Sequence, residues 1–292
     1  MPAPQPGILM EENAHALYLV LRAKRGTSPR ALIKACAEAP ALTATMARHY
    51  PKAALRCTIA YGRGLLADGA GWPTPPAHLA DLKPIHSKAG DVPRTPADVL
   101  FHIGSARHDL NFALARELLA AVGDRAEVVD EVAGFRYLET RDLTGFMDGT
   151  ANPKGRERAE AGLIGPEDRG FAGGSYVLIQ RFVHDLDAWS RLSLKRQEAA
   201  IGRTKTDSVE LAGRKKLPTA RASPSIPSTA GGWSAGCNRR ESRSRRRPSG
   251  RVAVVVSARR PYWWISPRAT RPASQQSASR MVACSPIVTA IS

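Results

Sequence analysis

An α+β fold is predicted for the first 140 residues of this 292-residue chain. Four segments there have the β-branched and aromatic content of strands. Two further segments place apolar residues at helical spacing. The order of these six elements is β-α-β-β-α-β, the split βαβ pattern of a ferredoxin-like antiparallel sheet with its helices on one face. The sequence therefore predicts one sheet covered by one layer of helices.

The first three elements precede residue 62. A buried strand is expected over Ala16–Ala23, because this segment is aromatic and β-branched. A helix is expected to open at Ser28 and Pro29, with the serine at the N-cap and the proline at the first helical position. A second strand is expected over Arg56–Tyr61.

The other three elements follow a long connection. Residues 62–95 are rich in proline, glycine and histidine, and we expect them to wrap over the surface. The third strand is predicted over Val99–Ile103, an amphipathic helix over Arg107–Val122, and the fourth strand over Glu127–Val132.

Two more elements are predicted in residues 141–211. Ser175–Val183 has the alternating pattern of a strand, and Ser193 is placed to cap a helix that runs to about Ile201. After these elements the composition changes abruptly, and residues 212–292 form a basic, low-complexity tail that we expect to be disordered or out of frame.

Most of the charge lies in that tail. Residues 214–292 hold 16 Lys and Arg and the single acid Glu241, so +15 of the formal net charge of +17 belongs to them. The run Arg243–Arg247 could bind phosphates. However, no aromatic residues are interleaved with it, so a solvated charge run is the favoured interpretation. Nucleic-acid binding is therefore not expected except through this tail.

The cysteines and the hydropathy pattern indicate a reducing compartment. Four widely spaced cysteines form no CxxC pair, which argues against a zinc site and a disulfide framework. No signal-peptide pattern is seen at the start, and no apolar run is long enough to cross a membrane. The expected location is the cytoplasm, without membrane association.

The stretch GFMDGTANP at residues 145–153 is the strongest functional candidate. It places the carboxylate of Asp148 between Gly145 and Gly149 and closes on Asn152 and a proline, which predicts an irregular loop. Two consecutive ordinary turns would have the same composition. Alternatively, the glycines let a planar ligand approach the backbone, and the acid acts as a proton carrier.

The flanks of this stretch resemble the dye-decolorizing (Dyp-type) haem peroxidases. The resemblance runs through six further segments: Asp98–Ile103, Arg107–Leu110, Val128–Val132, Gly134–Tyr137, Gly173–Leu186 and Ile201–Lys205. It implies two ferredoxin-like halves, of which residues 1–140 are the N-terminal one. Residues 141–211 would begin the C-terminal, haem-binding half, which is left incomplete by the tail 212–292.

The resemblance also implies a cofactor, partners and roles for residues. Haem b is the expected cofactor, hydrogen peroxide the oxidant, and aromatic dyes or phenols the reductants, in a homo-oligomer. Asp148 would be the catalytic acid and base, with a low pKa that favours acidic conditions. The expected haem-binding residues lie in the same loop: Phe146, Met147, Gly149, Thr150 and Asn152.

No metal ligand is predicted. The family takes its axial histidine from a segment soon after the position of Lys205, whereas no histidine follows His184 here. His102, His108 and His184 are interpreted as ordinary histidines at element ends, and Cys237 and Met281 lie in the tail. A frameshift near residue 212 would explain the loss, and sequencing of the gene tests it. The alternative to a peroxidase is an inactive family remnant that acts at most as an oligomerising or basic-tail binding protein.

Overall fold

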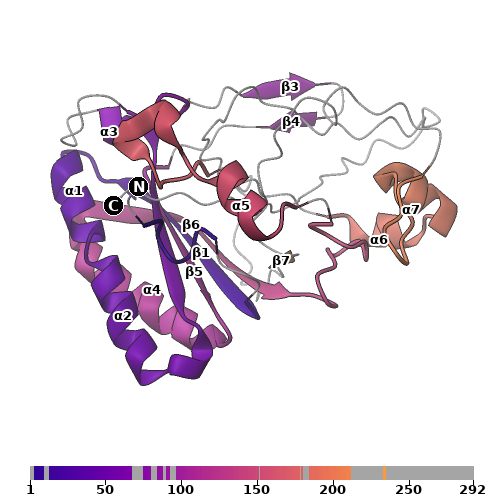
Figure 1. Cartoon of the computed structure of the whole chain (residues 1–292), viewed down its shortest axis with the longest axis horizontal. Helices are drawn as coiled ribbons and strands as arrows, with labels where there is room; N and C mark the ends of the chain where they lie inside the picture. The colour runs from indigo at the N-terminus through magenta and orange to yellow at the C-terminus, as the bar shows by residue number, and fades with distance from the viewer. Residues whose placement is uncertain are drawn as a thin grey trace, which may run out of the picture.

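A five-stranded antiparallel sheet is at the centre of the structure (Figure 1). The computed structural model describes residues 3–9, 13–67, 75–79, 84–87, 90–92, 97–150, 152–177, 179, 184–211 and 233–234. The strands lie in the order β2-β5-β1-β6-β7. Their bounds are Arg56–Tyr61 for β2, Val99–Ser105 for β5, His15–Ala23 for β1, Ala126–Arg136 for β6 and Trp233–Ser234 for β7.

Three helices cover one face of this sheet: α1 (Pro29–Cys36), α2 (Ala39–His49) and α4 (His108–Val122) (Figure 1). Helix α4 packs on β1 and β5, α2 packs on β2, and both α1 and α2 contact α4. The predicted β-α-β-β-α-β order with one helical layer is therefore confirmed, and β6 extends four residues beyond its predicted end at Val132.

The remaining elements are short. They are α3 (Arg63–Ala67), the hairpin strands β3 (Ile85–Ser87) and β4 (Gly90–Val92), α5 (Gly155–Gly162), α6 (Leu186–Ser190), α7 (Leu194–Ile201), and 3-10 turns at Pro51–Ala53, Gly123–Arg125 and Pro166–Phe171. The helix predicted after Ser193 is confirmed as α7, although the Ser193 side chain makes no capping hydrogen bond.

Two expectations for the first half were wrong in detail. The helix that opens at Pro29 ends at Cys36, and a second, unpredicted helix begins at Ala39. Pro40 in the first turn of α2 explains the break, because a proline within a continuous helix would remove a backbone hydrogen bond. The connection 62–95 does not only wrap the surface, since α3 in it buries Leu65 and Leu66.

The strand predicted over Ser175–Val183 is not observed where the segment is described. Residues 175–177 and 179 are not in a strand, and the other residues lie outside the described part. A strand needs a hydrogen-bonded neighbour, and the described segments provide none for these residues. Of the tail, only Trp233 and Ser234 are described, and they pair with the end of β6. Its expected disorder therefore stays a prediction.

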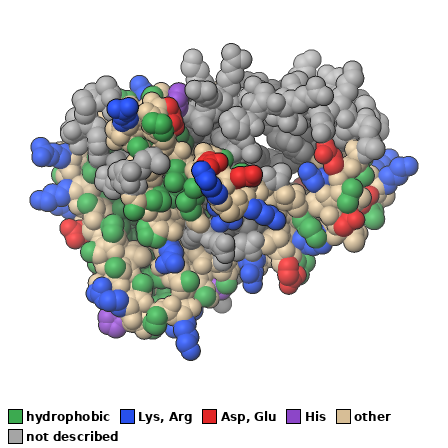
Figure 2. Space-filling view, in the orientation of Figure 1, with side chains coloured by type: hydrophobic (Ala, Val, Ile, Leu, Met, Phe, Trp, Pro, Cys, Tyr) green, Lys and Arg blue, Asp and Glu red, His purple; other side chains and the backbone are tan. Residues whose placement is uncertain are grey.

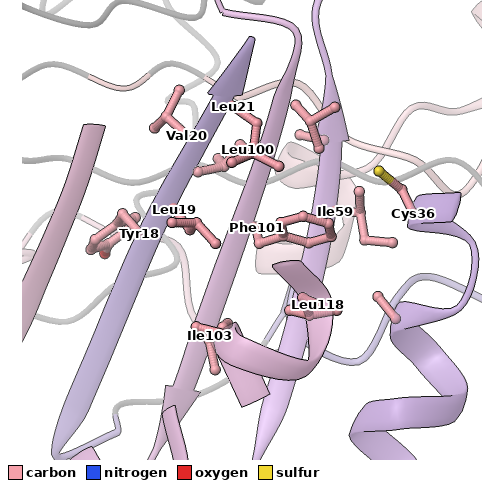
Figure 3. Packing of buried hydrophobic residues seen from close by; sticks show 14 of the residues in the cluster. Tyr18, Leu19, Val20, Leu21, Cys36, Ile59, Leu100, Phe101, Ile103 and Leu118 are labelled. Carbon is pink, nitrogen blue, oxygen red and sulfur yellow. The ribbon is translucent and has the colours of Figure 1, made fainter. Parts of the chain in front are cut away.

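The core lies on both faces of the sheet. Ile59, Phe101 and Leu19 are cross-strand partners on β2, β5 and β1, and Figure 3 shows Phe101 beside Leu118 of α4. The next row, Thr58, His102 and Tyr18, points to the opposite face, because side chains alternate along a strand. Every residue of β5 is buried, as expected of a strand covered on both sides.

Both charge signs occur across the face of the molecule in Figure 2, where Lys and Arg side chains alternate with Asp and Glu. Four ion pairs between described residues are exposed on the surface, among them Arg22 with Glu127 and Arg156 with Glu160. Exposed pairs of this kind contribute little to stability. The packed sheet, rather than surface charge, therefore holds this part of the chain together.

His102 is an uncharged histidine inside the sheet. Its ring stacks on Tyr18 with the ring centroids 4.6 Å apart and an interplanar angle of 7°. Among the described residues, neither ring nitrogen has a hydrogen-bond partner. Burial lowers the pKa of His102 to about 4, because the core does not solvate the imidazolium.

The burial of His102 is expected to make the protein less stable in acid. The unfolded chain takes up a proton near pH 6.5 and the folded chain only near pH 4, so the stability present above pH 6.5 is lost as the pH falls through this window. We expect His102 to lower the free energy of unfolding by about 2 kcal/mol between pH 8 and pH 5. Urea unfolding of His102→Phe at both values should show that part of the loss removed.

The matched control is His49→Phe, since His49 lies exposed at the end of α2. This variant should keep the full pH dependence of the parent. An equal dependence in the parent and in His102→Phe would contradict the interpretation.

Candidate functional site

Residues Thr140–Gly149 form a tight hairpin, here called the Asp148 hairpin. The Asp148 N–H donates to the Thr140 carbonyl at 2.8 Å, and Arg141 and Met147 form an antiparallel bridge between the two arms. The irregular loop predicted here is confirmed, since residues 145–150 lie in neither helix nor strand, and one isolated bridge with its backbone hydrogen bonds orders it. Asp148 is therefore held at the end of a hydrogen-bonded ladder.

The turn of the hairpin is closed by Asp142 and Gly145. The Gly145 N–H donates to the Asp142 carbonyl at 2.9 Å, and the Asp142 N–H donates to the Phe146 carbonyl at 2.9 Å. The Asp142 carboxylate also accepts from the Thr144 N–H, at 2.8 Å, and from its hydroxyl. The φ angle of Gly145 is +85°, a conformation that strains any residue with a Cβ.

Asp148 is a half-buried carboxylic acid with one fixed oxygen. Its Oδ1 accepts from the Gly149 N–H at 2.7 Å. Burial raises the pKa of Asp148, the charge of Asp142 raises it further, and the Gly149 hydrogen bond opposes both. The low pKa expected from the sequence was therefore wrong, because the pattern of residues did not show how far the hairpin is enclosed.

Phe146 and Met147 precede the acid and differ in burial. The Phe146 side chain is 3% exposed and packs edge to face on Trp189 of α6, with ring centroids 6.1 Å apart. Met147 is half-buried. Phe146 therefore anchors the hairpin to the protein interior. A contact of Phe146 or Met147 with haem stays a prediction.

Gly149, Thr150 and Asn152 continue from the hairpin. The φ angle of Gly149 is +69°, and a Cβ there would lie 2.8 Å from the amide nitrogen Nδ2 of Asn152. The Asn152 N–H donates to the Gly149 carbonyl at 3.0 Å, whereas Thr150 is exposed. The space left by Gly149 is therefore taken by a side chain of the same loop. Haem binding by these three residues also stays a prediction.

Sequence reasoning missed the side chains that hold the hairpin in place, one from within it and one from α6. Arg141 donates to the carbonyls of Gly145 and Lys205, both at 2.8 Å, and the Trp189 Nε1 donates to the Thr144 carbonyl at 3.0 Å. The sequence did contain one signal for the Lys205 contact, because Lys205 ends one of the segments on which the family resemblance rests. These long-range contacts are not visible in the spacing of the residues.

The three histidines considered from the sequence, His102, His108 and His184, lie in different environments. His102 is enclosed in the core, and the ring of His108 on α4 lies 5.9 Å from that of His15 on β1. His184 is half-buried; burial lowers its pKa, and the nearby charge of Asp142 opposes this. Within the described ranges, no three His, Cys, Asp or Glu side chains are grouped to hold a metal ion. Cys237 and Met281 lie outside those ranges.

Two family models match the chain. The Dyp-type peroxidase N-terminal model matches residues 5–136, and the Dyp-type peroxidase C-terminal model matches residues 139–231. The second match contains the Asp148 hairpin and runs past residue 212, where the sequence predicted the resemblance to end. Across the described residues, no helix is both long and apolar enough to span a bilayer.

Named relatives show the same similarity. The chain is 52% identical over 119 residues to a dye-decolorizing peroxidase of Mycobacterium tuberculosis. The aligned stretch covers 41% of this chain and 36% of the relative. It is 36% identical over 215 residues to one of Rhodococcus erythropolis, or 72% of this chain and 61% of the relative. A solved Rhodococcus jostii DypB variant in complex with heme has a TM-score of 0.66 at 41% identity, covering 72% of this chain and 67% of that chain. The chain thus spans about one-third to three-fifths of these curated relatives.

Proposed function

Because the chain belongs to the Dyp-type peroxidase family, we propose that it is a haem-dependent peroxidase that reduces hydrogen peroxide and oxidises aromatic dyes or phenols. The supporting observation is Asp148, a half-buried acid fixed by a hairpin within the matched C-terminal region. The Rhodococcus jostii relative solved with heme supports haem as the cofactor.

In this proposal Asp148 moves a proton. Its carboxylate Oδ1 accepts a hydrogen bond from the Gly149 N–H, which holds the carboxyl in one orientation. The raised pKa of Asp148 brings its two protonation states closer in energy near neutral pH, as general acid and base catalysis requires. Bound haem would supply the iron at which peroxide is reduced.

The donor set of this chain fits only one side of a haem site. The hairpin offers a fixed acid, but the resemblance places the axial histidine after Lys205, and no histidine follows His184. His102 is buried in the core, where neither ring nitrogen is accessible to solvent. An axial ligand is therefore assigned to no residue of this chain.

Addition of haemin to the purified full chain tests the proposal. A Soret band that saturates at one haemin per chain, together with peroxide-dependent oxidation of an anthraquinone dye, is the expected result. Haemin in the same buffer without protein is the control for free haem. His184 is the histidine nearest in sequence to the segment after Lys205, from which the family takes its axial ligand. Loss of the Soret band in His184→Gln would identify His184 as the iron ligand.

A colourless chain without dye oxidation would overturn the proposal and support the inactive remnant. In that case retention of labelled nucleic acid at low salt, and its loss at high salt, would point to binding by the basic tail.

The proposal also includes a compartment and an assembly state. Cys36 and Cys57 are both free thiols, which supports a reducing compartment such as the cytoplasm. Homo-oligomerisation is proposed from the family resemblance alone, since single exposed apolar side chains such as Leu138 are normal on a protein surface.

A further inference from the structure

Lys205 is fixed at both ends beneath the Asp148 hairpin. Its Nζ donates to the Gln197 Oε1 at 2.8 Å and lies 5.6 Å from the centroid of the Phe146 ring. Its backbone N–H donates to the Glu198 carboxylate at 2.9 Å. The position of this side chain is therefore set by α7, which contributes both Gln197 and Glu198.

Gln197 is itself prearranged to receive the lysine. Its side chain is 6% exposed, and its Nε2 donates to the carbonyls of Trp189 and Leu192 at 3.0 and 3.2 Å. These two bonds fix the amide so that Oε1 faces Lys205. A buried amide with all of these partners is a rigid support.

Gly145 leaves the space that Lys205 occupies. A Cβ on Gly145 would lie 2.7 Å from the lysine Cε and 3.3 Å from Nζ. The two residues are also joined through Arg141, whose Nη1 donates to the carbonyls of both. The first glycine of the hairpin is thus explained by an approaching side chain of the protein, in addition to its positive φ.

Three side chains from three segments therefore hold three successive hairpin residues. Trp189 holds the Thr144 carbonyl, Arg141 holds the Gly145 carbonyl, and Lys205 lies on the Phe146 ring. Asp148 follows Phe146 by two residues and pairs back to Thr140. A displacement of Phe146 would shift the ladder that places the acid.

We propose that Lys205 is a positioning residue that fixes the Asp148 hairpin through Gly145 and Phe146. The inference rests on the proposed role of Asp148 for its functional meaning, although the contacts do not depend on haem. Lys205 acts by geometry, since the charged group that raises the pKa of Asp148 is Asp142.

The test compares Lys205→Met with Lys195→Met by amide hydrogen exchange and carbon-detected NMR titration of Asp148 in the full chain without added haemin. Methionine keeps the aliphatic stem and removes the ammonium group. Lys195 is exposed on α7, the helix whose Gln197 and Glu198 hold Lys205, and is the matched control. In Lys205→Met, exchange at the Gly145 and Asp148 amides should be about tenfold faster or more. Exchange in β1 and β5 should be unchanged.

The pKa of Asp148 separates positioning from a direct charge effect. Loosening of the hairpin exposes the carboxyl, so the pKa should fall toward its ordinary value in Lys205→Met, and Lys205→Arg should restore most of the parent behaviour. A rise of the pKa, or equal exchange in Lys205→Met and Lys195→Met, would overturn the inference. Neither readout uses peroxidase activity, so a failure of the proposed function leaves this test decisive.

Discussion

Replacement of Asp148 by asparagine is expected to lower the rate of peroxide-driven dye oxidation by about 10²- to 10⁴-fold in haem-loaded protein. The amide keeps the size of the side chain and its acceptor for the Gly149 N–H, but it is not a general acid or base at neutral pH. The hairpin should therefore keep its shape while proton transfer is lost. Steady-state oxidation at saturating peroxide measures the effect.

The matched control is Asp124→Asn, the same chemical change at an exposed acid that forms an ion pair with Lys24. It should retain the parent rate. An Asp148→Asn variant with the parent rate would remove the role assigned to this acid, provided that both variants bind haemin equally by the Soret band.

The pH dependence of the same assay gives a second comparison. Burial and the charge of Asp142 raise the pKa of Asp148. A step that needs its ionised form is lost as the pH falls through that pKa, so the acid limb should lie at a higher pH than an exposed aspartate would give. Asp148→Asn should lack this limb.

The first half of the fold could be predicted because its signals are local. The strand over Arg56–Tyr61 was predicted with its observed bounds, since β-branched and aromatic residues end at a glycine. The break between α1 and α2 was missed, because the apolar spacing that favours helix continues to Ala37 while Pro40 prevents a single continuous helix.

The candidate site could be predicted only in part. The sequence located Asp148 between its glycines, but the raised pKa depends on burial, which comes from segments distant in the chain. Arg141 and the Lys205 carbonyl are separated by 64 residues, and no local pattern indicates that they meet. The resemblance named the segment that contains Lys205, and only the structure shows its place beneath Phe146.

Phe101→Ala is expected to lower the free energy of unfolding by roughly 3–5 kcal/mol. Phe101 is fully buried in β5, between β2 and β1, where it faces Leu118 of α4 (Figure 3). Truncation removes apolar area from the core and leaves a cavity, because strands paired on both sides cannot collapse into it. Urea unfolding followed by far-UV circular dichroism gives the difference.

Phe112→Ala supplies the control, because Phe112 is on α4 with 54% of its side chain exposed. The same truncation there removes no core contact, and alanine favours a helix more than phenylalanine does, so the free energy of unfolding should change by about 0.5 kcal/mol or less. Equal losses in the two variants would mean that the sheet between β2 and β1 is not the centre of the folded chain. A large loss for Phe101→Ala alone would show that the packing of this row holds the N-terminal half together.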